Sequence, residues 1–234
     1  MQIEIWSDFA CPFCYIGKTR LENAIKKTGN QHIELVYKAY QLDPTAPKKS
    51  DVVAKDYYMN RKGFSAEKVA QFFGQIEAMA AQSGLEYHME KTIHTNSFDA
   101  HRLAKWADTL GKEAELTTRL MVAYFKEGAD LADHDTLLSL VKEMGLDDEA
   151  AAKVLADPQA FKQEVQAQMS EAREIGVSGV PFFVINRKYG ISGAQEEALF
   201  LQALNQVLEE EKTQLKSFNS ANGASCDDES CQIE

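Results

Sequence analysis

Two cysteines separated by two residues, Cys11 and Cys14, are the residues of this chain best suited to chemistry. Two thiols at this spacing lie one helical turn apart, close enough to form and break a disulfide with each other. Cys11 would attack a substrate disulfide as the thiolate, and Cys14 would then attack the resulting mixed disulfide. The spacing predicts thiol–disulfide exchange with Cys11 as nucleophile and Cys14 as resolving thiol.

The residues around this motif predict a strand, a short loop and the start of a helix. Residues 1–7, MQIEIWS, alternate apolar and polar side chains as a strand does, and Pro12 suits the first turn of a helix. The positive end of the helix dipole would lie beside Cys11 and favour its thiolate. Phe13 carries no positive charge, whereas a histidine between the cysteines could stabilise the thiolate. The sequence therefore predicts a less oxidising cysteine pair.

Two other interpretations of Cys11 and Cys14 are weaker. Buried structural thiols would not need the proline-led turn or the strand before it. A zinc site would need two more ligands, and the remaining cysteines, Cys226 and Cys231, lie far along the chain in an acidic tail with no histidine close by. We therefore expect no metal and no other cofactor.

A proline near the other end of the chain is the second candidate site residue. Residues 176–181, Gly-Val-Ser-Gly-Val-Pro, precede the apolar run 182–185. An ordinary trans Pro181 could open a strand there, because its missing N–H would break no ladder hydrogen bond. A cis bond, found at about 5–6% of bonds to proline, is the alternative.

Three segments spread along the chain resemble the DsbA-like branch of the thioredoxin superfamily, and within it the FrnE-like group. The segments are residues 7–14 (SDFACPFC), 95–103 (TNSFDAHRL) and 176–183 (GVSGVPFF). The resemblance implies a thioredoxin-like fold and a protein-disulfide oxidoreductase or isomerase. It also implies a cis bond at Val180–Pro181, opposite the CxxC helix, where the backbone pairs with an extended substrate. Val180, Pro181, Pro12 and Phe13 are the expected substrate-binding residues.

The same wider family contains glutathione-linked enzymes, the 2-hydroxychromene-2-carboxylate isomerases and the kappa-class glutathione transferases. A serine typically stands in them where Cys11 stands here, and a serine cannot form a mixed disulfide. Exchange with protein disulfides or thiols is therefore the preferred function. A glutathione-dependent transferase or isomerase, and a chaperone-like binding module with an idle CxxC, are the alternatives.

Hydrophobic periodicity predicts an α/β chain: a thioredoxin-like fold with an inserted all-helical domain. A second strand is expected within residues 31–40, and helical periodicity extends from about 51 to 155. Asp157 and Pro158 predict the N-cap and first residue of another helix, after which come two strands in a hairpin and a helix over about 195–213. The expected boundaries are 1–48 and 157–215 for the two parts of the thioredoxin-like domain, 49–156 for the helical insertion and 216–234 for a flexible acidic tail.

Two cysteines in that tail form a possible second redox pair. Cys226 and Cys231 follow a segment of linker composition, and three carboxylates lie between them. Those carboxylates disfavour thiolate formation, so the pair should be a poor first nucleophile. An auxiliary dithiol that exchanges with the primary pair, and two incidental thiols, are equally good interpretations.

Other conspicuous polar residues have simpler interpretations. His101 with Asp99 and Arg102 could suggest acid–base chemistry, but the segment should be helical, and packing or lining of the substrate groove is the better interpretation. Asp8, three residues before Cys11, could move a proton or cap the loop.

Composition narrows the class of protein. The chain has 234 residues, a net charge of −11 and 44% hydrophobic residues, as expected of a folded enzyme. The acidic balance argues against nucleic acid and anionic membranes as partners, since both need a basic surface. No apolar leader precedes the first strand, so a cytoplasmic location is expected. The oligomeric state has no signature in the sequence.

Overall fold

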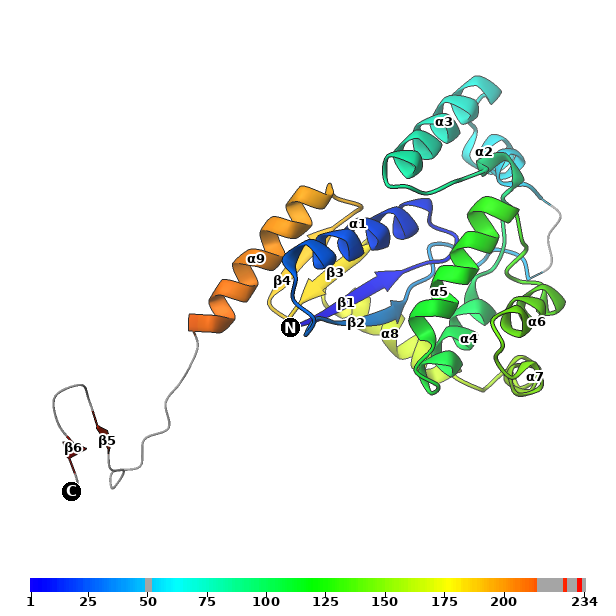
Figure 1. The fold of residues 1–234 in the computed structure, drawn as a ribbon. Helices are drawn as coiled ribbons and strands as arrows, with labels where there is room; N and C mark the ends of the chain where they lie inside the picture. Colours follow the sequence, from blue (N-terminus) through cyan, green and yellow to red (C-terminus); the bar gives the residue numbers. More distant parts are fainter. Residues whose placement is uncertain (49–51, 214–224, 227–230, 233–234) are drawn as a thin grey trace.

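A four-stranded sheet lies at the centre of the computed structural model, which describes residues 1–48, 52–213, 225–226 and 231–232 (Figure 1). Its strands lie in the order β2-β1-β3-β4, with β1 parallel to β2 and antiparallel to β3. Their bounds are Gln2–Ser7 for β1, Glu34–Ala39 for β2, Phe182–Ile185 for β3 and Tyr189–Ser192 for β4. The N-terminal strand is therefore central, and the loop that follows it, residues 8–11, is the candidate active-site loop.

The alternation of side chains in β1 decides which helices cover each face of the sheet. Ile3 and Ile5 pack with apolar residues of α1 (Pro12–Thr28) and α9 (Glu197–Thr213). Trp6, on the opposite face, packs against α8 (Lys162–Glu174), and its indole N–H donates to the carbonyl of Gln168 at 3.0 Å. The sheet thus lies between α1 and α9 on one face and α8 on the other (Figure 1).

The remaining helices gather at the end of the sheet toward which β1 and β2 run (Figure 1). They are α2 (Ala54–Lys62), α3 (Ala66–Gln82), the short 3-10 helix η1 (Met89–Lys91), α4 (Phe98–Asp108), α5 (Glu113–Val122), the π-helical turn η2 (Ala123–Glu127), α6 (His134–Glu143) and α7 (Asp148–Ala156). Their apolar residues share one core cluster with Phe9, Cys11, Cys14 and Ile16 of the active-site loop and helix. The helices are therefore packed directly against the CxxC segment.

The order of elements predicted from the sequence is confirmed, with one boundary wrong. The helix expected to start at Pro158 starts at Lys162, after a turn in which Phe161 has a φ of 56°. Asp157 closes that turn, because its carboxylate accepts the N–H of Gln159 at 2.9 Å. The guanidinium of Arg102 donates to the carbonyls of Asp157 and Ala160. These side-chain bonds replace the first helical turn.

The acidic tail contributes only two short strands to the described residues. β5 (Ser225–Cys226) pairs antiparallel with β6 (Cys231–Gln232), with Cys226 opposite Cys231 in the register. Across the described part of the chain, no helix is both long and apolar enough to cross a membrane.

Candidate active site

The loop from β1 to α1 places Cys11 directly before the first residue of the helix. Pro12 occupies that first position, and Cys11 has extended backbone angles, φ −91° and ψ 113°. The N–H of Cys11 donates to the carbonyl of Asp8 at 3.1 Å, and the N–H of Cys14 donates to the carbonyl of Cys11 at 3.0 Å. These turns bring both cysteines to the N-terminal end of α1, where the helix dipole favours an anion.

The two thiols are free, and their sulfurs have different partners. The Cys11 thiol donates to the carbonyl of Val180 at 3.4 Å, whereas the Cys14 sulfur accepts the N–H of Asp8 at 3.4 Å. Burial raises the pKa of Cys14 well above its ordinary value and Cys11 adds to the rise, while the Asp8 N–H and the Ser7 hydroxyl oppose it. Cys14 is therefore held as a neutral thiol; both cysteines are buried.

The Val180–Pro181 peptide bond is cis, as predicted, and lies opposite the start of α1. Gly17 allows this close approach of strand and helix. A Cβ on Gly17 would lie 3.0 Å from Cγ of Pro181 and 3.1 Å from Cζ of Phe183, closer than side chains normally pack. The missing side chain at Gly17 thus lets the proline loop reach Cys11, a role that the sequence analysis did not identify.

Asp8 fixes the active-site loop through both carboxylate oxygens. Oδ1 accepts the N–H of Ala10 at 3.2 Å, and Oδ2 accepts the N–H of Leu42 at 2.7 Å. Nε2 of His101 lies 3.6 Å from Oδ1, too far for a direct hydrogen bond. Of the two roles considered for Asp8, these contacts fit capping of the loop.

The polar residues of α4 point to different neighbours and form no single catalytic group. His101 packs against the ring of Phe9, with centroids 4.7 Å apart, behind the active-site loop. Asp99 instead pairs with Arg102 at 2.8 Å and with His134 at 2.9 Å. The predicted packing role describes these contacts better than acid–base chemistry does.

Tyr87 is a site residue that the sequence analysis missed. Its hydroxyl donates to the carbonyl of Pro12 at 2.8 Å, between the two cysteines, and its ring stacks on Phe125 with centroids 4.6 Å apart. Burial, followed by the nearby Cys11 and Cys14, raises the pKa of this tyrosine well above its ordinary value. Tyr87 lies in a loop of no distinctive pattern, so only the three-dimensional fold brings it to the site.

A cavity of about 920 Å³ opens beside the active-site loop, and the sequence analysis did not anticipate it either. Tyr57 of α2 stacks on His94 at 3.6 Å between ring centroids, and Nε2 of His94 lies 3.3 Å from the Asp43 carboxylate. Burial lowers the pKa of His94, although Asp43 opposes the shift. The lining of the cavity also includes Asp8, Ala10, Leu42, Val52, Tyr58, Arg61 and Lys62.

The remaining site predictions concern the tail and metals. The auxiliary pair Cys226 and Cys231 stays a prediction, because the side chains of the tail lie outside the described residues. Within the described ranges, no group of three or more histidine, cysteine, aspartate or glutamate side chains is arranged to hold a metal ion.

Comparison with known proteins assigns the chain to a family. Residues 2–205 match the DSBA-like thioredoxin domain, and the chain belongs to this family. The predicted thioredoxin-like α/β fold with a helical insertion is thereby confirmed.

Individual relatives agree with this assignment. The crystal structure of a probable DsbA oxidoreductase, SCO1869 from Streptomyces coelicolor, is 34% identical, has a TM-score of 0.86 and covers 100% of this chain and 99% of its own. The uncharacterized protein YwbO of Bacillus subtilis is 28% identical over 88% of this chain and 96% of its own length. The thiol:disulfide interchange protein DsbA of Azotobacter vinelandii is 25% identical over 80% of this chain and 85% of its own.

Proposed function

We propose that this protein is a thiol–disulfide oxidoreductase or isomerase of the FrnE-like group, acting on protein disulfides through Cys11 and Cys14. The observation that carries the proposal is the division of roles between the sulfurs. Cys11 lies at the helix N-terminus against the Val180 carbonyl, whereas Cys14 accepts the Asp8 N–H and has a raised pKa. A nucleophile and a resolving thiol need this arrangement.

The proposed reaction has two exchange steps. The Cys11 thiolate attacks a substrate disulfide, and one substrate sulfur leaves as a thiolate. Cys14 then loses its proton and attacks Cys11, which releases the second substrate sulfur and leaves a Cys11–Cys14 disulfide. The substrate disulfide gains two electrons and the protein dithiol loses them; the reverse order oxidises a substrate dithiol.

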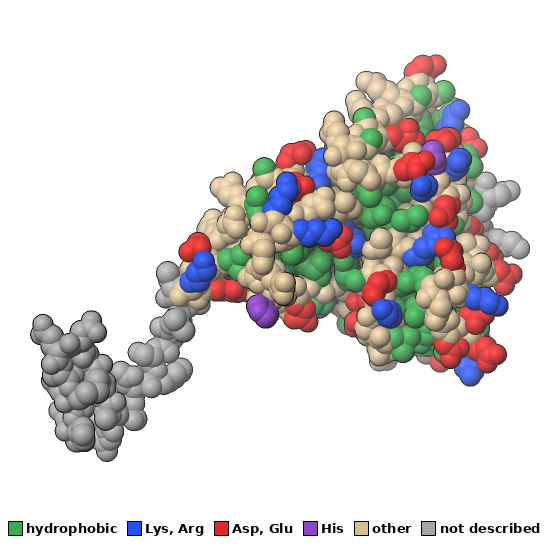
Figure 2. Space-filling view, in the orientation of Figure 1, with side chains coloured by type: hydrophobic (Ala, Val, Ile, Leu, Met, Phe, Trp, Pro, Cys, Tyr) green, Lys and Arg blue, Asp and Glu red, His purple; other side chains and the backbone are tan. Residues whose placement is uncertain are grey.

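Protein chains are the proposed substrates. Hydrophobic side chains gather in the hollow between α1 and α3 (Figure 2). Phe13, Tyr15 and Val180 are partly buried and pack against the apolar cluster that contains Cys11 and Cys14. The Val180 carbonyl lies beside Cys11, where it can also accept an N–H of an extended peptide. An apolar surface with a backbone acceptor suits an unfolded segment. The cytoplasmic location stays a prediction from the sequence.

Trapping of mixed disulfides tests the proposal. The variants Cys11→Ser and Cys14→Ser are mixed with a scrambled disulfide substrate, in a chain that also carries Cys226→Ser and Cys231→Ser. Cys14→Ser should accumulate a covalent complex through Cys11, and Cys11→Ser should accumulate none. Equal trapping by both variants, or by neither, would contradict the assigned roles.

A glutathione-dependent transferase or isomerase is the second candidate, and the large cavity supports it. Arg61 and Lys62 line the cavity and can pair with the carboxylates of a small peptide thiol, while Asp8 and Ala10 connect its rim to the CxxC loop. Glutathione titration distinguishes the two functions. Saturable binding that survives in Cys11→Ser and is lost in Arg61→Ala would favour the second candidate.

A further inference from the structure

The charged side chains that line the large cavity beside the active-site loop fall into two groups. Asp8 accepts two backbone N–H groups, and the Asp43 carboxylate lies 3.3 Å from Nε2 of His94, so these carboxylates are occupied within the wall. Arg61 and Lys62 line the same cavity and have no ion-pair or hydrogen-bond partner within the described residues. Two cations are therefore available to a ligand.

A buried serine adds an unused hydroxyl to the same lining. Ser97, the N-cap residue of α4, is only 3% exposed, and its side chain makes no capping hydrogen bond. In the part of the chain that the structure describes, its hydroxyl has no other partner, yet it is not fully enclosed, so it faces the cavity. Buried polar groups are almost always hydrogen-bonded, and an unpaired one indicates a polar group supplied by a ligand.

The position of the charges on α2 gives the cavity a positive end. Arg61 and Lys62 lie in the last turn of the helix, whereas Asp56, the remaining carboxylate of the lining, lies in its first turn. Five residues of helix separate Asp56 from Arg61 by about 7.5 Å along the axis. Burial lowers the pKa of His94, and Arg61 and Lys62 add to that fall, so their field reaches this histidine. A ligand carboxylate is therefore attracted to the end of the cavity near His94.

An apolar part of the lining connects the cavity with the CxxC motif. Leu42 and Val52 line it and are among the exposed large apolar side chains of the described residues. The Leu42 N–H donates to Asp8, which also binds the N–H of Ala10, the residue before Cys11. A cavity of about 920 Å³ is roughly 10 Å across, the span of about three extended residues. A chain attached to Cys11 can thus place a nearby side chain inside it.

We propose that this cavity binds an acidic side chain of the protein substrate, a few residues from the cysteine that reacts with Cys11. Arg61 and Lys62 pair with the carboxylate, the Ser97 hydroxyl donates to it, and Leu42 packs against the substrate chain. The inference rests on the proposed function and names the protein disulfides that it prefers. In a chain of net charge −11, the two cations offset the repulsion of an acidic partner.

Peptides that carry a 2-pyridyl disulfide on a single cysteine test this proposal, again with Cys226→Ser and Cys231→Ser present. The Cys11 sulfur bonds to the peptide sulfur, and pyridine-2-thiolate leaves and is measured by absorbance. Matched peptides carry glutamate, glutamine or lysine at two, three or four residues from the cysteine. In the best position, the glutamate peptide should react about three- to tenfold faster than the glutamine peptide. The ratio should shrink as salt rises, because salt screens exposed charges.

Charge reversal makes the test specific. Arg61→Glu with Lys62→Glu should reverse the order, so that the lysine peptide reacts faster than the glutamate peptide, a change that a loss of structure cannot produce. Both residues are exposed, so the variant should fold. Lys26→Glu with Lys55→Glu, which changes two exposed lysines outside the cavity lining, should keep the order of the parent chain. Ser97→Ala should lower the preference for glutamate.

The possible outcomes separate this inference from the proposed function. Equal rates for glutamate and glutamine peptides at every position, or a preference for glutamate that survives charge reversal, would overturn this inference alone. S-methylglutathione, which has two carboxylates and no free thiol, should compete poorly. Loss of the preference at micromolar concentrations of it would assign the cavity to a small peptide thiol and also overturn the inference. Absence of release with every peptide would overturn the proposed function and this inference with it.

Discussion

The contacts of individual side chains explain why the two cysteines differ. Cys11 contacts a backbone carbonyl of the proline loop, whereas Cys14 is enclosed beneath the loop and accepts one backbone N–H. Tyr87 holds the residue between them, because its hydroxyl donates to the Pro12 carbonyl. The positions of the sulfurs thus depend on a tyrosine 75 residues away in the chain.

Tyr87→Phe tests this positioning role. Loss of the hydroxyl removes one buried hydrogen bond and should lower the free energy of unfolding by about 1 kcal/mol. The first turn of α1 should also loosen, so the rate of disulfide exchange should fall by up to about tenfold, as small misplacements of reacting groups do. Chemical denaturation and an insulin reduction assay measure the two effects.

Tyr124→Phe is the matched control for that variant. The Tyr124 hydroxyl donates to the carbonyl of Ile93 at 2.7 Å, so its removal should cost similar stability. Because this bond joins η2 to the carbonyl of Ile93 and not to the backbone of α1, the exchange rate should remain that of the parent protein. Equal losses of rate in both variants would assign Tyr87 a purely structural role.

The sequence predicted the site residues that belong to short motifs and missed those brought in by the fold. Cys11, Cys14 and the cis bond at Pro181 follow from local spacing and family resemblance, and the structure brings them together. Tyr87 carries no local pattern, since its contact with Pro12 depends on how the inserted helices pack against the sheet. Patterns along the chain cannot encode such long-range contacts.

At the level of elements, α1 and β3 must approach closely for the site to form. Gly17 is the point of contact: an added Cβ would lie 3.0 Å from Pro181 Cγ and 3.3 Å from the Cα of Ala194. The Ala194 contact involves backbone, so the clash cannot be relieved by rotating a side chain. The spacing between helix and proline loop is therefore fixed by a glycine.

Gly17→Ala should accordingly destabilise the protein and weaken substrate exchange. Overpacking of this kind costs about 1–3 kcal/mol, and displacement of the proline loop from Cys11 should slow mixed-disulfide formation. Gly74→Ala in α3 is the control, because a Cβ there meets nothing within 4 Å. That control should gain about 0.5–1 kcal/mol from helix propensity. Thermal unfolding compares the two, and a stabilised Gly17→Ala would refute the packing argument.

Contacts between elements also explain why α8 starts later than the sequence predicts. Local sequence favours a helix from Pro158, but Arg102 of α4 binds the carbonyls of Val154, Asp157 and Ala160. These carbonyls are drawn to one guanidinium, so the chain turns there and the helix begins four residues later. A contact between elements overrides a local propensity that the sequence expresses correctly.

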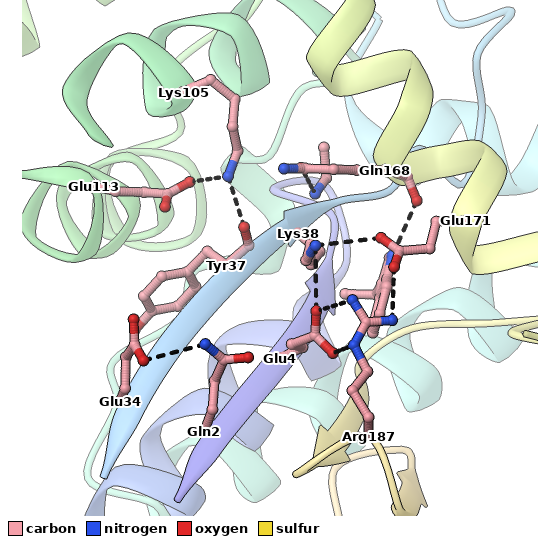
Figure 3. A network of polar contacts seen from close by, with 12 residues as sticks. Gln2, Glu4, Glu34, Tyr37, Lys38, Lys105, Glu113, Gln168, Glu171 and Arg187 are labelled. Atoms are coloured by element: carbon pink, nitrogen blue, oxygen red, sulfur yellow. Dashed lines mark hydrogen bonds and ion pairs between the residues drawn. The ribbon is translucent and has the colours of Figure 1, made fainter. Parts of the chain in front are cut away.

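Across the whole molecule, ionic contacts centred on the buried Glu4 tie the sheet to the helices around it. Glu4 of β1 pairs with Lys38 of β2 at 3.2 Å and with Arg187 of the β3–β4 turn, and Glu171 of α8 joins both cations (Figure 3). On the other side, Lys105 of α4 donates to the backbone of β2. Helices on two sides of β2 are therefore linked through polar groups as well as through the core.

The shared core predicts that the inserted helices and the sheet unfold together. The chain has two tryptophans, Trp6 in β1 and Trp106 in α4, so Trp6→Phe and Trp106→Phe each leave one fluorescent probe in a different part of the molecule. Because the cluster around Cys11 and Cys14 includes residues of both parts, separation would expose a large apolar surface. Within each variant, the urea midpoint from tryptophan fluorescence should coincide with that from circular dichroism.

The variant Arg102→Lys tests whether a loss of stability in α4 is shared by the sheet. A lysine cannot reproduce the fork by which Arg102 binds Asp99 and three backbone carbonyls, so the free energy of unfolding should fall by about 2–4 kcal/mol. If the molecule unfolds as one unit, this change in α4 must lower the midpoint reported by Trp6 as much as that reported by Trp106. A shift seen by Trp106 alone would mean that the helical insertion unfolds separately, and that its packing against the CxxC loop contributes little to the stability of the sheet.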